Sequence, residues 1–567
     1  MAQPVPAPYS ATLHTRFEQM FPVLSEEEVG RLQRFGTLCR FGRGDVLFDA
    51  GKPSPGMYLI ISGHASVTQR DGMHHVTPIV EQGPGQFIAE VGQLSGQYAL
   101  VDVVADDDLT AVLIPQDRLR ALIVEEAVLG ERITRALILR RVSLMESGGG
   151  GVVLIGHGGS AAVVRLQGFL ARNVQPHRLL DPSGDEEAAA LVARLAVGAA
   201  DLPLAVCPSG TILRNPTDKQ LAREIGMVAS ARAEERFDVV IVGAGPSGLA
   251  TAVYGASEGL SVAVVDRRGY GGQAGASARI ENYFGFPTGI SGQALSGRAY
   301  VQAQKFGTRM LMPVCVERLV PERVDGLLQI ELDDGSRLRA KAVVVASGAD
   351  YRRPAIPDLA SFEGRGVWYW ASPLEAKMCT RAEVVLVGGG NSAGQAAVFL
   401  AGFAAKVHMV IRGAGLKQTM SSYLISRIAA APNIVLMPRT EVTALVGDAG
   451  GQLAEVECTN RETGATQAIA TRNLFLFVGA DPATRWLANG GVLLDAAGFV
   501  VTGGPAGRHL LESSIPGVFA VGDVRSGSVK RVGAAIGEGA QVVAALHAFL
   551  AAEPAPVPDA ALPAQAA

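Results

Sequence analysis

Hydrophobic runs and glycine turns alternate along the second half of the 567-residue chain. Residues 239–242 form a run of β-branched side chains, which predicts a buried parallel strand. Glycines follow it, and the apolar spacing of residues 249–256 predicts a helix. A second buried run, residues 262–265, is followed directly by an acidic residue. This order of strand, glycine turn, helix, strand and acid predicts a dinucleotide-binding unit.

The glycines of this unit have separate tasks. Gly243 allows the tight turn, Gly245 lets the backbone approach a pyrophosphate, and Gly248 lets the helix pack on its strand. The helix N-terminus offers unpaired N–H groups and a partial positive charge to phosphates. Asp266 follows the second strand, where its carboxylate can accept hydrogen bonds from a ribose. A glycine-rich turn without a ligand is the alternative, but the surrounding elements make the motif specific.

A second unit of the same kind lies within residues 353–482 and interrupts the first. Its strands are predicted at residues 383–387 and 406–412. A nucleotide whose ribose carries a 2′-phosphate needs a cation after the second strand, where an NAD site carries an acid. Arg412 holds that place, which favours NADPH over NADH. The candidate binding residues of this unit are Gly388, Gly390, Asn391, Ala393, Arg412 and Lys417.

Residues 233–352 and 483–550 together with the inserted unit resemble the low-molecular-weight thioredoxin reductase family. The resemblance rests on the glycine motifs and on Gly271-Gly-Gln-Ala, Ile280-Glu-Asn-Tyr and Phe519-Ala-Val-Gly-Asp. It implies that the first dinucleotide is FAD and the second NADPH, and that the inserted domain rotates about hinges near residues 351–357 and 481–482. The flavin contacts that it implies are Gln273, Asn282, Gly348, Asp523 and Arg531.

The redox-active Cys-x-x-Cys of that family is missing from this chain. Trp370 and Pro373 occupy the places of the two cysteines. Neither side chain can act as a thiolate nucleophile, so the internal relay to thioredoxin is not expected. Cys379 lies nearby. We interpret it as a structural residue, with a mixed-disulfide role as the alternative, because a lone thiol cannot cycle through an internal disulfide.

Residues 1–147 predict a small β-barrel or jelly roll between helices, with a capping box at Ser25 and Glu28. The segment resembles the cyclic-nucleotide-binding domain family. Glu90 matches the family's ribose-binding glutamate, but no Lys or Arg lies between Asp71 and Gln116 to bind a cyclic phosphate. Loss of such a contact costs about 1.5–3 kcal/mol. We therefore expect a regulatory or assembly module with a weakened or altered ligand preference.

Residues 148–232 follow a glycine linker and resemble the glutaredoxin/thioredoxin fold. The resemblance implies a cis peptide bond at Pro203 and redox cysteines at residues 156–160. That stretch reads Gly-His-Gly-Gly-Ser, so the domain is not expected to perform dithiol chemistry. We interpret Cys207 as a core residue and His157 as a solvated loop residue, with a ligand contact as the alternative for His157.

Composition also bears on the partners and the cellular location that we expect. The 50 basic and 54 acidic residues nearly balance, which disfavours nucleic acid as a partner. Five scattered cysteines, no signal-peptide pattern and no uncharged run of about 20 residues predict a cytoplasmic protein that does not enter a membrane. The family resemblance implies a homodimer. The Ala- and Pro-rich tail, residues 551–567, is expected to be disordered.

The expected fold class is α/β, with two nested three-layer dinucleotide-binding domains behind a β-barrel or jelly-roll domain and a thioredoxin-fold domain. The leading hypothesis is an FAD enzyme that takes hydride from NADPH and passes electrons to an unidentified acceptor. A ferredoxin- or flavodoxin-type NADP reductase is one alternative. The other is a non-enzymatic redox or nucleotide sensor that couples the flavin state to a partner.

Overall fold

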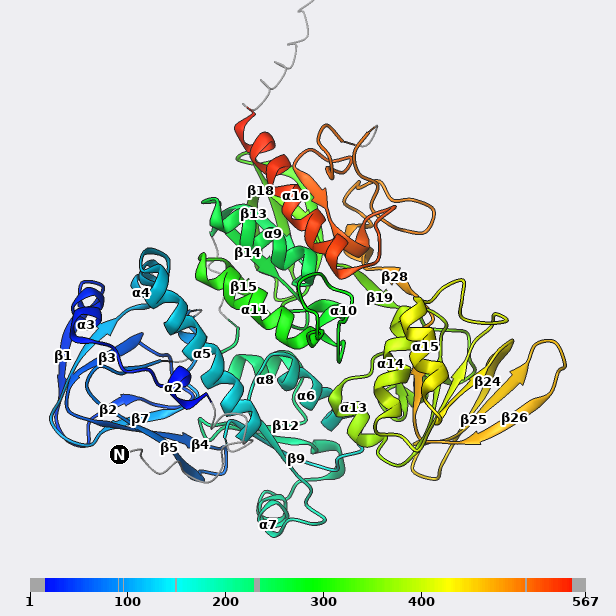
Figure 1. Cartoon of the computed structure of the whole chain (residues 1–567), viewed down its shortest axis with the longest axis horizontal. Helices are drawn as coiled ribbons and strands as arrows, with labels where there is room; N and C mark the ends of the chain where they lie inside the picture. Colours follow the sequence, from blue (N-terminus) through cyan, green and yellow to red (C-terminus); the bar gives the residue numbers. More distant parts are fainter. Residues whose placement is uncertain are drawn as a thin grey trace, which may run out of the picture.

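The computed structural model describes residues 16–89, 91–94, 96–147, 150–228, 235–504 and 507–552. The expectations for Glu90, for the start of the glycine linker and for most of the C-terminal tail concern residues outside these ranges. Within them the chain forms an N-terminal β-domain, a small α/β domain and two further α/β domains, of which the second interrupts the first. Figure 1 shows them from the blue N-terminal part to the red helix α16.

The N-terminal domain packs two antiparallel sheets, in the orders β1-β8-β3-β6 and β2-β7-β4-β5. Ser25 and Glu28 form the capping box that starts α3. Buried residues of both sheets and of the closing helices α4 and α5 make the core. The elements are α2 (Phe17–Met20), α3 (Glu26–Gln33), β1 (Thr37–Phe41), β2 (Val46–Phe48), β3 (Met57–Ser62), β4 (Ala65–Arg70), β5 (Val76–Gln82), β6 (Phe87–Ile88), β7 (Asp102–Ala105), β8 (Leu109–Ile114), α4 (Gln116–Glu125) and α5 (Ala127–Ser147).

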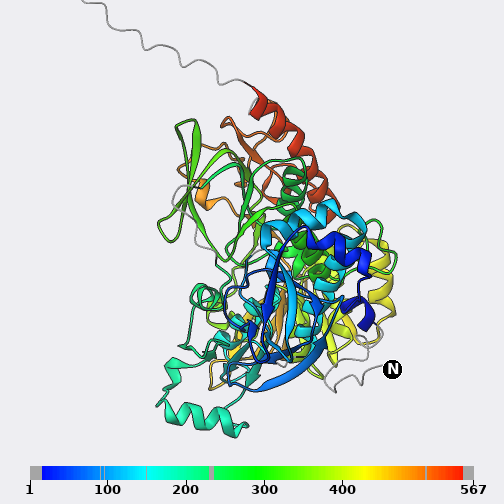
Figure 2. The ribbon, with the colours of Figure 1, turned by 90° about the vertical axis from the view of Figure 1, so that its left-hand side faces the viewer.

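The next domain is a four-stranded sheet in the order β10-β9-β11-β12, flanked by three helices. The peptide bond between Leu202 and Pro203 is cis, as the thioredoxin-fold resemblance implies. Figures 1 and 2 place this domain beside the N-terminal domain and against the rest of the chain. Its elements are β9 (Val152–Ile155), α6 (Ala161–Arg172), β10 (His177–Leu180), α7 (Glu186–Arg194), β11 (Leu204–Val206), β12 (Ile212–Arg214) and α8 (Asp218–Glu224).

The first dinucleotide-binding domain is built on a sheet in the order β15-β14-β13-β18-β17-β16, with β29 paired to β18. The strands β14, β13, β18 and β29 are parallel, and helices cover them, so their residues are buried on both faces. The elements are β13 (Arg236–Val242), α9 (Pro246–Ser257), β14 (Val262–Val265), α10 (Gly272–Gly275), α11 (Gly292–Lys305), β15 (Arg309–Leu311), β16 (Val316–Val324), β17 (Leu327–Leu332), β18 (Arg337–Val345), β29 (Val518–Ala520) and α16 (Val532–Ala551).

Helix α16 is the one described helix that is long and apolar enough to cross a membrane, with a mean hydropathy of 1.4. Its residues Val542 and Leu546 lie in the same buried cluster as Leu249 of α9. Glu538 of α16 accepts a hydrogen bond from the backbone N–H of Gly522 at 2.6 Å. One face of α16 therefore packs into the core of the first dinucleotide-binding domain.

The inserted domain has a parallel sheet in the order β20-β27-β21-β22-β23 and a three-stranded antiparallel sheet β24-β25-β26. The two-stranded ribbon of β19 and β28 joins it to the first domain. The α/β fold-class prediction, with Rossmann-type domains behind an N-terminal β-domain, is confirmed. The elements are β19 (Ala349–Tyr351), α12 (Leu359–Phe362), β20 (Val367–Trp368), α13 (Pro373–Met378), β21 (Glu383–Val387), α14 (Asn391–Ala401), β22 (Lys406–Val410), α15 (Ser422–Ala430), β23 (Ile434–Met437), β24 (Thr440–Gly447), β25 (Leu453–Asn460), β26 (Thr466–Ala470), β27 (Leu474–Leu476) and β28 (Ala480–Pro482).

Candidate cofactor site

A cavity of about 740 Å³ lies where the two dinucleotide-binding domains meet the domain of residues 150–228. The N-termini of α9 and α16 border it from the first domain, and α14 borders it from the inserted domain. Helix N-termini carry unpaired N–H groups and a partial positive charge, so this cavity is suited to nucleotide phosphates. Of the predicted flavin-site residues, the cavity is lined by Gly245, Asp266, Gln273, Asn282, Gly348, Asp523 and Arg531.

The first glycine turn has the steric properties that the motif predicts. Gly243 has φ +115°, and a Cβ there would lie 2.2 Å from the carbonyl oxygen of Ala346. A Cβ on Gly248 would lie 1.9 Å from the carbonyl oxygen of Gly243. A Cβ on Gly245 would come no nearer than 3.9 Å to another residue, and Gly245 borders the cavity. Two of the glycines thus allow close packing of the chain, and the third leaves space for a ligand.

Asp266 has a structural role that the sequence does not indicate. Its Oδ2 accepts a hydrogen bond from Ala244 N at 2.9 Å, and its Oδ1 accepts from Arg268 N and Gly269 N at 2.8 and 3.0 Å. The carboxylate thereby ties the glycine turn to the loop after β14. A carboxylate oxygen can accept a second hydrogen bond, so ribose binding by Asp266 stays a prediction.

The amides expected near the flavin ring differ in their surroundings. Gln273 Nε2 donates to the carbonyl oxygen of Ala349 at 2.5 Å, which fixes its side chain at the cavity wall. Asn282 is exposed and has no hydrogen-bond partner among the described residues. Its amide is free to contact a ligand.

Lys530 is a cavity residue that the sequence analysis missed. Its Nζ donates to the carbonyl oxygen of Asp523 at 2.5 Å and lies 4.4 Å from the centroid of the Phe499 ring. Burial raises the pKa of Asp523 and lowers the pKa of Lys530. With Arg531, Lys530 adds positive charge beside the N-terminus of α16, where an anionic group would be stabilised.

The second glycine turn is closed by the loop after β22. Thr419 Oγ1 donates to Gly389 O at 2.6 Å, and Ser421 N donates to Asn391 Oδ1 at 2.8 Å. Asn391 lines the large cavity, and Ala393 is buried behind it. The described residues Gly388, Gly390, Arg412 and Lys417 are not among those that line it. Arg412 and Lys417 are exposed and have no ion-pair partner among the described residues.

An aromatic cluster occupies the region where the family's cysteine pair is expected. Trp370 lines the cavity, and its Nε1 donates to Glu375 Oε1 at 3.0 Å. The Tyr351 ring lies 6.3 Å from the Trp370 ring, centroid to centroid. Pro373 starts α13, and Ser372 caps that helix. None of the five cysteines, all described, lines the cavity.

The N-terminal domain contains a second, much smaller cavity of about 40 Å³. Arg140 of α5 lines this cavity, and its guanidinium lies 4.7 Å from the Phe87 ring and donates to the carbonyl oxygens of Phe87 and Ala89 at 3.0 and 2.9 Å. Burial lowers the pKa of Arg140 to about 9. About 10–15 Å³ of such space is enough for one water, so this cavity could hold only a few. The cavity therefore has no room for a cyclic nucleotide in this arrangement.

The model of the pyridine nucleotide-disulphide oxidoreductase family matches residues 237–539, and that of the cyclic nucleotide-binding domain matches residues 38–126. Thioredoxin reductase from Bacillus subtilis is 31% identical over 307 residues, which cover 54% of this chain and 92% of the relative. A component of the alkyl hydroperoxide reductase of Pseudomonas putida is 31% identical over 317 residues, 56% of this chain. The match spans only 58% of the length of that reductase component.

Among solved structures, thioredoxin reductase from T. acidophilum is similar, with a TM-score of 0.52 and 30% identity over 56% of this chain and 100% of that chain. The protein therefore belongs to the pyridine nucleotide-disulphide oxidoreductase family and is thioredoxin reductase-like, with an N-terminal cyclic nucleotide-binding domain. The cofactor prediction, FAD and NADPH, is confirmed as that of the family.

Proposed function

We propose that the protein transfers hydride from NADPH to FAD and passes the electrons to an acceptor without a Cys-x-x-Cys relay. The observation that carries this proposal is the large cavity, because residues of both dinucleotide units line it and no cysteine does. When bound, the flavin supplies the redox step. The chain's own part is to bind and orient the cofactors, with Gly245 and Arg531 at the helix N-termini and Gln273 at the cavity wall.

The state of the thiols supports a mechanism that does not use them. Cys379 is fully buried, and burial raises its pKa to about 12. Burial likewise raises the pKa of Cys207 to about 12 and that of Cys458 to about 11. A thiol must ionise to act as a nucleophile or to exchange with a disulfide. Electrons would therefore leave the flavin directly, toward an acceptor that reaches the cavity.

An anaerobic titration with NADPH tests this function. Rapid bleaching of the flavin band near about 450 nm, followed by turnover with an added acceptor, is the expected result. The acceptors to screen are thioredoxin, a chromogenic disulfide, ferredoxin, a quinone and oxygen. Turnover with ferredoxin alone would identify the ferredoxin-type alternative. Slow stoichiometric reduction without turnover would favour a sensor, and purified protein without flavin would contradict both.

We expect NADPH to be preferred because Arg412 is exposed and unpaired among the described residues, at the end of β22. Arg412→Ala should raise the KM for NADPH about 10- to 100-fold through loss of a charge-assisted contact to the 2′-phosphate. The KM for NADH should not change. Arg461→Ala, which removes an exposed arginine 3.4 Å from Glu441 in the same domain, is the matched control. An equal rise in the KM for NADPH and in the KM for NADH would contradict the assignment of Arg412 to the 2′-phosphate.

The remaining expectations concern assembly and location. We propose a homodimer, as the family resemblance implies, and sedimentation of the flavin-loaded protein would measure it. A reducing cytoplasm is consistent with the five free cysteines.

A further inference from the structure

Helix α6 of the thioredoxin-like domain packs against the inserted domain along its first half. Val164 belongs to the same buried cluster as Trp368 and Ala371 of that domain. The carbonyl oxygen of Gly159, just before the helix, accepts a hydrogen bond from Gln452 Nε2 at 3.4 Å. The N-terminal half of α6 is therefore part of the inserted domain's packing.

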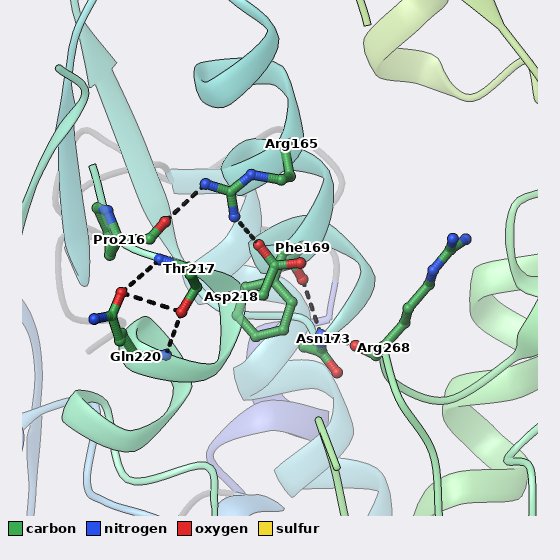
Figure 3. A network of polar contacts seen from close by, with 8 residues as sticks. All are labelled: Arg165, Phe169, Asn173, Pro216, Thr217, Asp218, Gln220 and Arg268. Carbon is green, nitrogen blue, oxygen red and sulfur yellow. Dashed lines mark hydrogen bonds and ion pairs between the residues drawn. The ribbon is translucent and has the colours of Figure 1, made fainter. Parts of the chain in front are cut away.

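The other end of the same helix is attached to the first dinucleotide-binding domain. Asn173 Nδ2 donates to the carbonyl oxygen of Arg268 at 3.0 Å (Figure 3). Gln293 Nε2 donates to the carbonyl oxygen of Ala171 at 2.9 Å. Gly269 leaves the space that Asn173 uses, since a Cβ there would lie 2.3 Å from Asn173 Oδ1. One helix thus connects the two domains that bind the two nucleotides.

Arg172, the last residue of α6, lies where these contacts meet. Its guanidinium carbon is 5.7 Å from the Trp370 ring centroid, and both residues line the large cavity. Within the described part of the chain, the Arg172 side chain contacts the Trp370 ring but makes no hydrogen bond or ion pair. An arginine over a tryptophan face is a favourable cation–π contact. Arg172 therefore helps to position Trp370, whose Nε1 also donates to Glu375 Oε1 at 3.0 Å, at the cavity that the predicted flavin residues line.

The rest of the connection between the two domains is suited to rotation. The covalent link is the two-stranded ribbon of β19 and β28, and hinges commonly consist of such short connecting segments. Among the described residues, direct contacts across the junction include the ion pair of Arg427 with Glu281 and the Tyr351–Trp370 ring contact. Without α6, little would fix the angle between the two domains.

The orientation that α6 fixes presents Trp370 to the cavity and leaves Gly388, Gly390 and Arg412 outside it. Hydride transfer requires the reacting atoms to approach to about 3–3.5 Å. We propose that α6 is an interdomain brace, with Arg172 as a positioning residue, and that it must release the inserted domain before NADPH can reduce the flavin. This inference rests on the proposed function.

A reversible crosslink between the brace and the inserted domain tests the requirement for release. A Cβ built on Gly364 would lie 3.2 Å from the Cβ of Ala161, close to the 3.5–4.5 Å that a disulfide needs. In Ala161→Cys/Gly364→Cys, oxidation should slow flavin reduction by NADPH at least about tenfold, and dithiothreitol should restore it, because domain motion gates such steps. The single variants Ala161→Cys and Gly364→Cys should not respond to oxidation, and the second shows the effect of the strain that a side chain brings to Gly364, whose φ is +73°.

Two results of the crosslinking experiment would overturn the brace. One is an oxidised double variant that is reduced by NADPH as fast as its dithiol form. The other is a folded double variant in which the cysteines do not form a disulfide. Absence of flavin reduction in every variant, including the dithiol form, would instead contradict the proposed function.

A readout without nucleotide tests the brace independently of activity. Arg172→Gln removes the contact with Trp370, whereas Arg165→Gln on the same helix removes contacts with Asp218 and Pro216 inside the thioredoxin-like domain (Figure 3). Proteolysis of the linker at residues 351–357 should be faster in Arg172→Gln than in Arg165→Gln. It should be slowest in the oxidised double variant. Equal cleavage in all three would overturn the brace.

Discussion

Gly248→Ala should yield purified protein without bound FAD. The added Cβ would lie 1.9 Å from the carbonyl oxygen of Gly243 and 3.0 Å from its carbonyl carbon, and both are backbone atoms that cannot rotate away. Overpacking of this kind costs about 1–3 kcal/mol and sometimes more. The displaced segment is the turn that is expected to hold the pyrophosphate of FAD. The variant should therefore lose affinity for FAD. The ratio of flavin absorbance to protein absorbance after purification measures it.

Gly297→Ala is the matched control for this prediction. Gly297 lies in α11 of the same domain, and a Cβ there meets nothing within 4 Å. Alanine is favoured over glycine inside a helix by about 1 kcal/mol, so this variant should be slightly more stable and keep its flavin. If Gly248→Ala retained a full complement of FAD, the assignment of this turn to the flavin would be wrong.

Local elements were predictable wherever short-range chemistry defines them. The capping box predicted at Ser25 and Glu28 starts α3. The apolar run at residues 262–265 is fully buried as β14, because helices and neighbouring strands cover a parallel strand on both faces. The glycine spacing indicated which positions allow close packing, and the structure gives the distances. The sequence signals of these features lie within a few neighbouring residues, although the packing itself involves distant segments such as Ala346 against Gly243.

Features that depend on long-range packing were missed. Arg172 and Trp370 are far apart in the chain, so no spacing rule connects them. Arg140 lies in the apolar stretch of α5, and its burial, at 7% exposure, follows only from the way that the helix packs on the β-domain. Asp266 was correctly placed after β14, but its three backbone hydrogen bonds depend on the loop conformation that follows.

Thioredoxin should not be reduced through a thiol of this protein, and Cys379→Ser should leave NADPH-driven turnover unchanged with whichever acceptor the screen identifies. Cys379 is the cysteine nearest in sequence to Trp370 and Pro373, but it is buried at the C-cap of α13, in the same apolar cluster as Val164. With a pKa of about 12, only about one molecule in 10⁵ would carry the thiolate at pH 7.

Turnover and the melting temperature should be measured together, because a buried Cys→Ser change also introduces a hydroxyl that needs a hydrogen-bond partner. Cys458→Ser, a buried thiol in the same domain, shows the effect of that change alone. Thioredoxin reduction that is abolished by Cys379→Ser at an unchanged melting temperature would contradict the direct route from the flavin and would assign the mixed-disulfide role to this residue.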